Sequence, residues 1–277
     1  MKVVGLGDQV VDNYEHIKTM FPGGNALNFA VFSKQLGHES AFLGVFGDDI
    51  AGTHVYNTVK NQGVDLSHSK CFHGENGCAR VTIINGDRVF LGSNKGGVVQ
   101  NTGLSLNKAD YSYLMEFDLI HSSVYSYSEK EVRRLKEMGA EISFDFSDDC
   151  NEEKLMKILP CVTYAFFSTS HLSESERETQ ANKALNNGCE LCLCTCGSKG
   201  AVLFHKSGVY HSPVYYVEAI DTMAAGDAFI TCFITEYIST GRSESSIADS
   251  LDKAAKFSAS QCLIKGSFGH GLKYGND

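Results

Sequence analysis

The 277-residue sequence has no tryptophan, only three prolines, no run of lysine or arginine, and no apolar stretch that approaches membrane-spanning length. A spanning helix needs roughly 18 or more apolar residues, so we expect no membrane-embedded segment. The net charge of −9 argues against a nucleic acid or an anionic membrane as partner. A bound phosphate would therefore depend on local backbone dipoles and on a metal ion.

Ten cysteines are present, and Asp8 interrupts the apolar run at the N-terminus, which does not fit an export signal. We therefore expect reduced thiols and a cytoplasmic location. Cys192, Cys194 and Cys196 alternate along one expected strand, which separates such side chains by roughly 6.5 Å. With no histidine or second Cys-x-x-Cys pair nearby, we expect small core residues; a metal site is the alternative.

Segments with strand and helix character alternate along most of the chain, which is typical of an α/β fold with a mainly parallel sheet. Strands are expected over residues 1–7, 40–46, 119–124, 141–146, 162–167, 190–195 and 201–204, and helices over 25–36, 129–138, 151–159, 174–186 and 243–263. A further helix ends near Gln62. The length is ample for one such domain, and no boundary is marked.

One part of the chain departs from this alternation. Residues 78–84 and 88–92 are extended runs around Asn85-Gly86, a strong hairpin signal. Together with residues 13–18 they would form a small antiparallel sheet. We expect this sheet, built from about residues 12–22 and 71–98, to stand off the main domain as a lid. An ordinary edge hairpin is the alternative.

The stretch around Asp227 resembles a strand-to-helix turn. Residues 214–220 have strand character, and an apolar helical pattern follows the turn. The small residues Ala224, Ala225 and Gly226 would let a ligand approach the backbone, where a helix start offers unpaired N–H groups. Asp227, in the first helical turn, could accept a proton from a hydroxyl that attacks a phosphoryl group. Alternatively, it merely favours the helix start.

Polar residues also follow the first expected strand. Asp8 and Asp12 lie at its carboxyl end, the edge where ligands bind in open α/β sheets. Asn25 and Asn28 are three residues apart near a helix start and so share one face. Helix capping is their alternative role, and it suits Asn25 better than Asn28.

Six motifs occur in an order that resembles the PfkB carbohydrate kinases, which have the ribokinase-like fold. They are Gly7-Asp8 with Asp12, Gly23-Gly24-Asn25 with Asn28, Gly47-Asp48-Asp49 with Gly52, Gly63-Val64-Asp65, residues 195–200, and Asp221-Thr222 with Gly226-Asp227. The resemblance covers nearly the whole chain. Residues 21–26, 87–90 and 144–148 are similar to the fructoselysine 6-kinase branch in particular. The resemblance implies one domain, residues 1–277, folded as a three-layer α/β sandwich with a mostly parallel central sheet and a small β-sheet lid.

The same resemblance implies an ATP-dependent kinase that acts on a primary hydroxyl of a sugar. Asp227 would be the catalytic base, with the backbone N–H groups of Ala224, Ala225, Gly226 and Asp227 as the anion hole. Asp12, Gly24 and Asn28 would bind sugar hydroxyls, and Thr195, Gly197, Gly200 and Gly266 would lie near the nucleotide. Mg²⁺ is expected because bridging phosphate oxygens requires a hard divalent cation. A monovalent cation near residues 221–223 and a homodimer through the lid are further implications.

Two features differ from the family pattern. Ala224 stands where the family usually has glycine; if it adopts a positive φ, the strain would be of order 1 kcal/mol. The family's Asn-x-x-Glu motif is not recognisable in residues 168–174. Glu174 is a candidate to serve Mg²⁺ through water, and a solvated helix start is its alternative role.

The expected acceptor end gathers Asp8, Asp12, Asp145 and Asp148, which disfavours a sugar that already carries phosphate. It suits neutral hydroxyls beside an ammonium, and fructoselysine offers both. Asp8 and Asp145 are therefore further candidates for sugar binding. The substrate carboxylate would reach Arg80, Arg88 or Lys95 of the lid, unless these form only a solvated hairpin face.

Other acceptors stay open at this point. Fructose, ribose and a nucleoside are alternatives; a nucleoside would need aromatic stacking, for which Tyr14, Phe21 and Phe90 are candidates. An alternative hypothesis of a different functional class is a sugar sensor without catalytic activity. Ala224 and the unrecognisable metal motif are the features that would favour it.

Overall fold

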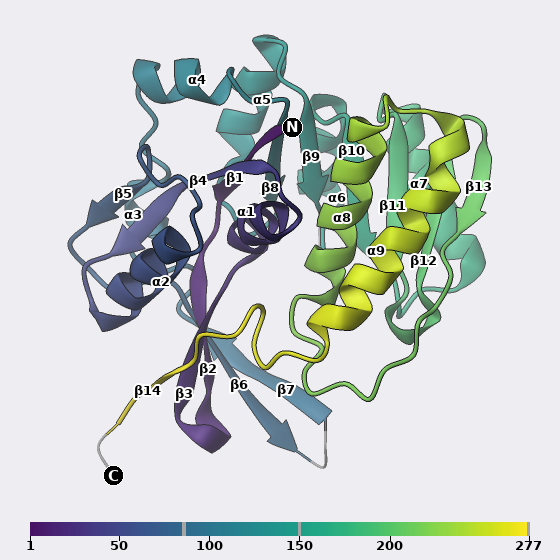
Figure 1. Ribbon diagram of the computed structural model, residues 1–277. Helices are drawn as coiled ribbons and strands as arrows, with labels where there is room; N and C mark the ends of the chain where they lie inside the picture. Colours follow the sequence, from purple (N-terminus) through teal and green to yellow (C-terminus); the bar gives the residue numbers. More distant parts are fainter. Residues whose placement is uncertain (85–86, 149–150, 276–277) are drawn as a thin grey trace.

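The computed structural model describes residues 1–84, 87–148 and 151–275, with the side chains of residues 83–88 outside the described set. The largest element is a nine-stranded sheet across the middle of the molecule (Figure 1). In spatial order its strands are β13 (Gly208–His211), β12 (Ala201–His205), β11 (Leu191–Thr195), β10 (Tyr164–Ser168), β9 (Ile142–Asp145), β8 (Leu119–Ser123), β1 (Lys2–Gly7), β4 (Glu39–Gly47) and β5 (Lys70–Phe72). These neighbours pair in parallel except β11 with β12 and β12 with β13. The expected mostly parallel α/β sheet is confirmed.

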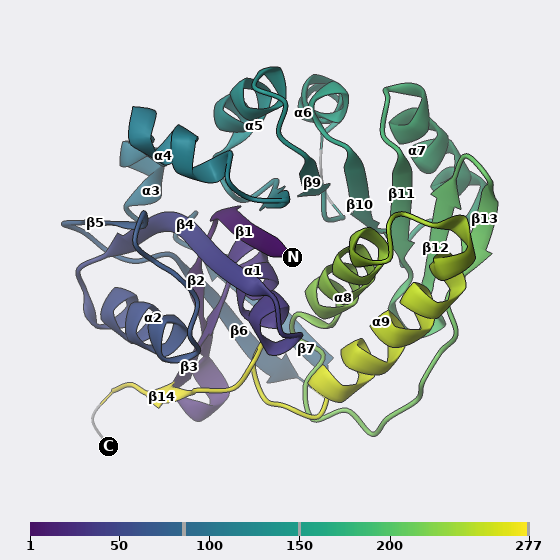
Figure 2. The same ribbon diagram turned by 45° about the horizontal axis from the view of Figure 1, so that its top comes forward.

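Helices cover both faces of this sheet, so the protein has three layers (Figure 2). One face carries α1 (Asn25–Gln35), α2 (Ile50–Asn61), α8 (Ala225–Ser239) and α9 (Ile247–Gln261). The other carries α3 (Val99–Thr102), α4 (Lys108–Leu114), α5 (Glu129–Glu137), α6 (Glu152–Ile158) and α7 (Glu174–Asn186). Of these helices, the sequence patterns missed α3 and α4.

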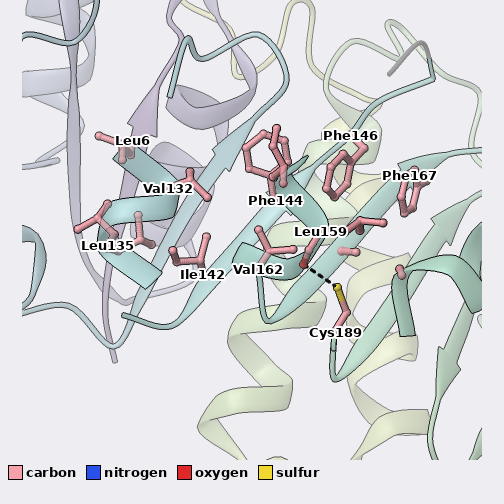
Figure 3. Close-up of a cluster of buried hydrophobic side chains, with 14 of the residues drawn as sticks. Leu6, Val132, Leu135, Ile142, Phe144, Phe146, Leu159, Val162, Phe167 and Cys189 are labelled. Carbon is pink, nitrogen blue, oxygen red and sulfur yellow. Dashed lines mark hydrogen bonds between the residues drawn. The ribbon is translucent and has the colours of Figure 1, made fainter. Parts of the chain in front are cut away.

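The core on the second face is aliphatic and aromatic (Figure 3). Val132 of α5 packs in one cluster with Phe144 of β9, and each such fully buried side chain stabilises the fold by about 1.5–3 kcal/mol. Cys192, Cys194 and Cys196 are buried in the same cluster, which confirms their interpretation as small core residues. The sulfur atoms of Cys192 and Cys194 are 3.9 Å apart, closer than strand spacing alone suggests.

The order in which successive parallel strands are added to the main sheet reverses at β1. β4 lies on one side of β1 and β8 on the other, and ligands of open α/β sheets bind beyond the carboxyl ends of the strands at such a point. Asp8 follows β1 directly, and Asp145 ends β9. Gly5 allows α1 to pack tightly on β1, because a Cβ there would lie 2.0 Å from the carbonyl oxygen of Ala26.

A second, five-stranded sheet extends from the main sheet beyond the carboxyl end of β1, and lies below the main sheet in Figure 1. Its order is β14 (Leu272–Lys273), β3 (Thr19–Gly23), β2 (Val10–Tyr14), β6 (Cys78–Ile84) and β7 (Asp87–Ser93). β2 and β6 pair in parallel, so the expectation of a wholly antiparallel sheet was wrong. β5 pairs with β4 of the main sheet rather than with this one. The Asn85-Gly86 turn lies outside the described residues, although β6 and β7 pair as antiparallel neighbours.

The expected strand over residues 214–220 does not form. The segment runs as exposed coil, with Val214 55%, Tyr216 92% and Ile220 61% exposed. Pro213, directly before the segment, has no N–H group to donate to a neighbouring strand, and among the described residues no strand pairs with residues 214–220. Within the described residues, no helix is long and apolar enough to cross a membrane.

Candidate functional site

The start of α8 is shaped by a turn at Ala224. Its φ of 57° and ψ of 15° lie in the left-handed region, which costs an alanine roughly 1–2 kcal/mol. The first i to i−4 hydrogen bond of the helix joins Ala228 N to Ala224 O at 2.8 Å, so the N–H groups of Gly226 and Asp227 precede the regular ladder. A Cβ at Gly226 would meet no atom within 4 Å. There is therefore free space beside Gly226 in the first turn of α8, which leaves room for a ligand near the helix start.

The Asp227 carboxylate is held by two amides from the first turn of α1. Asn25 Nδ2 donates to Oδ1 at 3.0 Å, and Asn28 Nδ2 donates to Oδ2 at 2.6 Å. Burial, and next the charge of Asp145, raise the pKa of Asp227 to about 7, while the bond from Asn28 opposes the rise. Since Asp227 keeps partial exposure, it is a carboxyl group able to exchange a proton near neutral pH.

Asp145 lies beside Asp227 and shares the amide of Asn25. Asn25 Nδ2 donates to Asp145 Oδ2 at 2.6 Å, and the backbone N–H of Ser147 donates to Oδ1 at 2.8 Å. Burial raises the pKa of Asp145 to about 6, and these two hydrogen bonds oppose the rise. One amide group thus bridges two carboxylates.

Asp8 fixes the beginning of α1. Its oxygens accept from the backbone N–H groups of Asn25 at 2.6 Å and Ala26 at 3.2 Å. They also accept from the hydroxyls of Ser123 and Ser126, at 2.9 and 2.6 Å. Asp8 therefore joins the ends of β1 and β8 to the helix that carries the two asparagines.

Asp12 and the glycine pair lie on the second sheet next to this cluster. Asp12 is 6% exposed, and its charge contributes to the raised pKa of Asp227. A Cβ at Gly23 would lie 2.3 Å from Asp12 Oδ2. Gly24, at φ 113°, would bring a Cβ within 2.7 Å of Gln9 Cα. Only glycines fit the turn that places Asp12 here.

Asp221 connects three segments around the start of α8. Its Oδ2 accepts from the Tyr14 hydroxyl at 2.6 Å and from the Gly266 N–H at 2.9 Å, and its Oδ1 accepts from the Met223 N–H at 3.0 Å. The second sheet, the C-terminal loop and the turn before α8 are thereby joined. Gly266 packs against Phe21, where a Cβ would lie 2.6 Å from the ring.

The remaining candidates lie apart from Asp227. Thr195 ends β11, and Gly197 and Gly200 flank the tight turn that follows, at φ 59° and 83°. Glu174 is exposed at the first residue of α7. The side chain of Arg88 lies outside the described residues. Thr195, the two glycines and Glu174 follow the carboxyl ends of β11 and β10 of the main sheet, whereas Arg88 is on β7 of the second sheet. The roles of all these residues stay predictions.

Sequence reasoning missed the residues behind the carboxylates. Asn25 was placed in a motif, with capping as its alternative role, but was assigned no contact with a carboxylate, whereas its side chain bridges Asp145 and Asp227. His121 Nε2 contacts Asn25 Oδ1 at 2.9 Å, and Ser123 supports Asp8. Polar residues at the carboxyl end of an otherwise apolar strand were the available signal.

Asn28 has one further feature. Its Oδ1 is buried and has no hydrogen-bond partner among the described residues. An orphaned buried acceptor beside a carboxylate that can titrate near neutrality suits a ligand rich in hydroxyl groups.

Comparisons with known proteins agree with this geometry. A family model for the pfkB family carbohydrate kinases matches residues 3–267. The chain is 42% identical over 275 residues to fructosamine kinase FrlD of Bacillus subtilis (strain 168), covering 99% of this chain and 95% of the relative. It is 31% identical over 229 residues to fructoselysine 6-kinase of Escherichia coli (strain K12), covering 83% and 86%. A putative ribokinase II from E. coli, solved in complex with ATP and Mg²⁺, superposes with a TM-score of 0.77 at 20% identity over 96% of this chain and 94% of that chain.

The architecture is thus the ribokinase-like sandwich that the motifs implied. The family match spans nearly the whole chain and includes Asp227. The chain belongs to the pfkB family of carbohydrate kinases and is a phosphotransferase that acts on a sugar hydroxyl.

Proposed function

We propose that this chain transfers the γ-phosphoryl group of ATP to the 6-hydroxyl of fructoselysine, with Asp227 as the catalytic base. The carrying observation is the position of the Asp227 carboxylate in the first turn of α8, beside the open space at Gly226 and under the amides of Asn25 and Asn28. Its pKa of about 7 matches the removal of a hydroxyl proton near neutral pH.

Each part of the site has a distinct task in this reaction. ATP with Mg²⁺ would supply the phosphoryl group. The backbone amides of residues 224–227 would donate to its oxygens as charge develops, a contribution that is usually large in such enzymes. Asn28 Oδ1, which lacks a partner among the described residues, would accept from a sugar hydroxyl, and Asp12 and Gly24 would bind others. Asp227 would take the proton of the attacking hydroxyl.

The charge of the acceptor end supports an unphosphorylated, amine-bearing sugar. The charged groups that act most strongly on Asp227 are Asp145, Asp8 and Asp12, all acidic. A sugar phosphate would be repelled, whereas the secondary ammonium of fructoselysine would be attracted. Two relatives named for fructosamine and fructoselysine fit this preference. On the second sheet, Arg80 forms an ion pair with Glu15 at 3.5 Å, and its side chain is 54% exposed. A substrate carboxylate could therefore still contact its guanidinium group.

The nucleotide would lie along the carboxyl edge between α8 and the turn at residues 197–200. Val214, which is 55% exposed, lies next to this turn, where a Cβ at Gly200 would be 3.1 Å from its Cγ2. Such an exposed apolar side chain suits a planar base. Mg²⁺ is commonly held by phosphates, waters and one or two carboxylates. Among the described residues no cluster of three or more His, Cys, Asp or Glu is arranged as a metal cage, so the ion would arrive with the nucleotide and Glu174 would act through water.

The second sheet would act as a lid that excludes water from the sugar. Its outer strand β7 exposes Phe90 at 64% and Leu91 at 40%, which supports a homodimer formed through the lid. Light scattering of the protein and of Phe90→Glu checks the dimer, with Val209→Glu on β13 as the matched exposed control. A monovalent cation near Asp221 is checked by comparing rates in K⁺ and Na⁺. Free thiols at the nine described cysteines fit a cytoplasmic location.

A substrate panel tests the proposal. ADP formation is measured with fructoselysine, fructose, ribose, adenosine and fructose 6-phosphate, each with ATP and Mg²⁺. We expect the highest kcat/KM with fructoselysine. A higher value with fructose would overturn the narrower assignment, and no turnover with any sugar would indicate a silent sensor.

A variant tests the base. Asp227→Asn should lower kcat by several orders of magnitude with little change in nucleotide affinity. Asp249→Asn is the matched control, because Asp249 is also an acid in the first turn of a helix, α9. If both variants retain activity, Asp227 is only a helix-start residue.

A further inference from the structure

A buried polar chain runs behind the two bridged carboxylates. Ser143 Oγ lies 2.9 Å from His121 Nδ1, and His121 Nε2 lies 2.9 Å from Asn25 Oδ1. Asn25 Nδ2 then reaches Asp145 at 2.6 Å and Asp227 at 3.0 Å. Three elements, β9, β8 and α1, contribute to this chain.

The chemistry of these side chains determines which atom donates and which accepts in each hydrogen bond of the chain. Two carboxylates accept hydrogen bonds, so Asn25 must turn its NH₂ group toward them and its oxygen toward His121. His121 Nε2 must therefore carry a hydrogen. Burial lowers the pKa of His121 to about 3, so the ring is neutral at physiological pH and its Nδ1 accepts from the Ser143 hydroxyl.

The imidazole ring is held rigidly by its neighbours. It is 2% exposed and stacks on Phe29 with the centroids 4.4 Å apart and the planes at 19°. The Phe166 ring is also near, with its centroid 6.1 Å from that of His121, and Ser143 is fully buried. The ring cannot turn away without breaking this packing, so its donor is fixed in direction.

We propose that His121 is a positioning residue, whose Nε2–H locks the Asn25 amide in the orientation that donates to both Asp145 and Asp227 and so keeps the base ionised and correctly aimed. The inference rests on the proposed role of Asp227. Without this donor, the Asn25 amide can turn its oxygen toward Asp145 or Asp227 once one of these carboxyl groups has taken up a proton. That arrangement favours a protonated carboxyl group, which cannot act as a base.

The negative charges around Asp227 make its hydrogen bonds from the side-chain amides of Asn25 and Asn28 important for keeping it ionised. Asp145 on β9, Asp8 after β1 and Asp12 on β2 are the charged groups that face it, and each raises its pKa. The opposing hydrogen bonds come from Asn28 and Asn25 on α1. Ionised Asp227 is therefore stabilised by neutral donors, and only Asn25 depends on a second residue for its orientation.

Two substitutions of His121 separate positioning from packing. His121→Phe keeps a ring against Phe29 but removes the donor, whereas His121→Gln keeps an N–H near the position of Nε2. We expect His121→Phe to lower kcat about tenfold at pH 7 with the KM for ATP unchanged. The acid limb of its pH profile should move upward by about half a unit or more. His121→Gln should restore both toward the wild type.

A measurement independent of turnover completes the test. The Asp227 carboxyl carbon is titrated by ¹³C NMR in the wild type and in both variants, with Asp227→Asn for assignment. An upward shift in His121→Phe that is absent in His121→Gln supports the inference even where the acceptor sugar is wrongly assigned. Identical titrations in all three overturn it, while the kinase function stands. Should His121→Phe fail to fold, Ser143→Ala takes its place, because loss of the Ser143 hydroxyl lets the His121 proton move from Nε2 to Nδ1. Ser143→Ala must then shift the Asp227 titration upward; an unchanged value overturns the inference.

Discussion

Replacing the proposed catalytic base should make the protein more stable. In the folded protein the Asp227 carboxylate lies among Asp145, Asp8 and Asp12, and burial is the largest cause of its raised pKa. Asp227→Asn removes this charge and keeps the shape of the side chain. We therefore expect a variant that is inactive and yet more resistant to unfolding above neutral pH.

The size of the effect follows from the pKa. It rises from an ordinary value of 3.8 to about 7, so the folded protein binds a proton that the unfolded chain releases, and stability is lost as pH rises through this interval. At about 1.4 kcal/mol for each pKa unit, the penalty has an upper bound of roughly 4.5 kcal/mol. The new amide must face the donors of Asn25 and Asn28, which offsets part of the gain at a cost of about 1–3 kcal/mol. A net gain of about 2 kcal/mol remains.

Urea unfolding of the wild type and Asp227→Asn between pH 4 and pH 8.5 measures this difference. The gain should be full above pH 7 and should disappear as the pH falls. Near pH 4 Asp227 is protonated in the folded wild type, so only the cost of the amide remains and the variant should be less stable by about 1–3 kcal/mol. Asp249→Asn, on the surface of α9, serves as control and should show no such trend. A variant that is less stable than the wild type at pH 8, or a gain that does not change with pH, would refute the reasoning.

Four further predictions concern the same site. The kcat/KM of the wild type should fall below about pH 7 as Asp227 takes up its proton, which a pH profile checks. Gly226→Ala should lower kcat about tenfold or more by filling the anion site, while urea unfolding shows stability unchanged or higher by about 0.5–1 kcal/mol. Gly23→Ala, whose Cβ would lie 2.3 Å from Asp12 Oδ2, should raise the KM for sugar and not that for ATP. Ala224→Val should destabilise the fold by about 2 kcal/mol relative to Ala224→Gly, because a β-branched residue tolerates the φ of 57° poorly.

The order of strands and helices was predictable because it depends on local patterns. β1 is an apolar run that ends at Gly7, and α1 begins after the glycine pair that precedes Asn25. The position of Asp227 in the first turn of a helix was predictable as well, because a turn of small residues precedes an apolar helical pattern. The left-handed backbone at Ala224 was also foreseen as a condition and is observed.

Pairing between distant segments was less predictable. The parallel pairing of β2 with β6 joins residues far apart in the chain, and neither strand carries a local mark of its partner's direction. Residues 214–220 failed as a strand for a related reason: an apolar, β-branched sequence becomes a strand only where a neighbour can pair with it. Among the described residues, no strand of either sheet pairs with this segment, and its side chains are largely exposed.

The role of the Asn25 side chain could not be predicted from the sequence. Its position at a helix start favours capping, and at that level any small polar residue would serve. Its function instead depends on which end of its amide faces Asp145 and Asp227, and that orientation depends on His121, 96 residues away. A side-chain orientation set by a distant neighbour leaves no periodic or compositional signal. If Asp227 is the base, as we propose, its acidity is a property of the folded packing around α1, β8 and β9. We therefore expect substitutions far from Asp227 in the sequence to change the pH at which this kinase works.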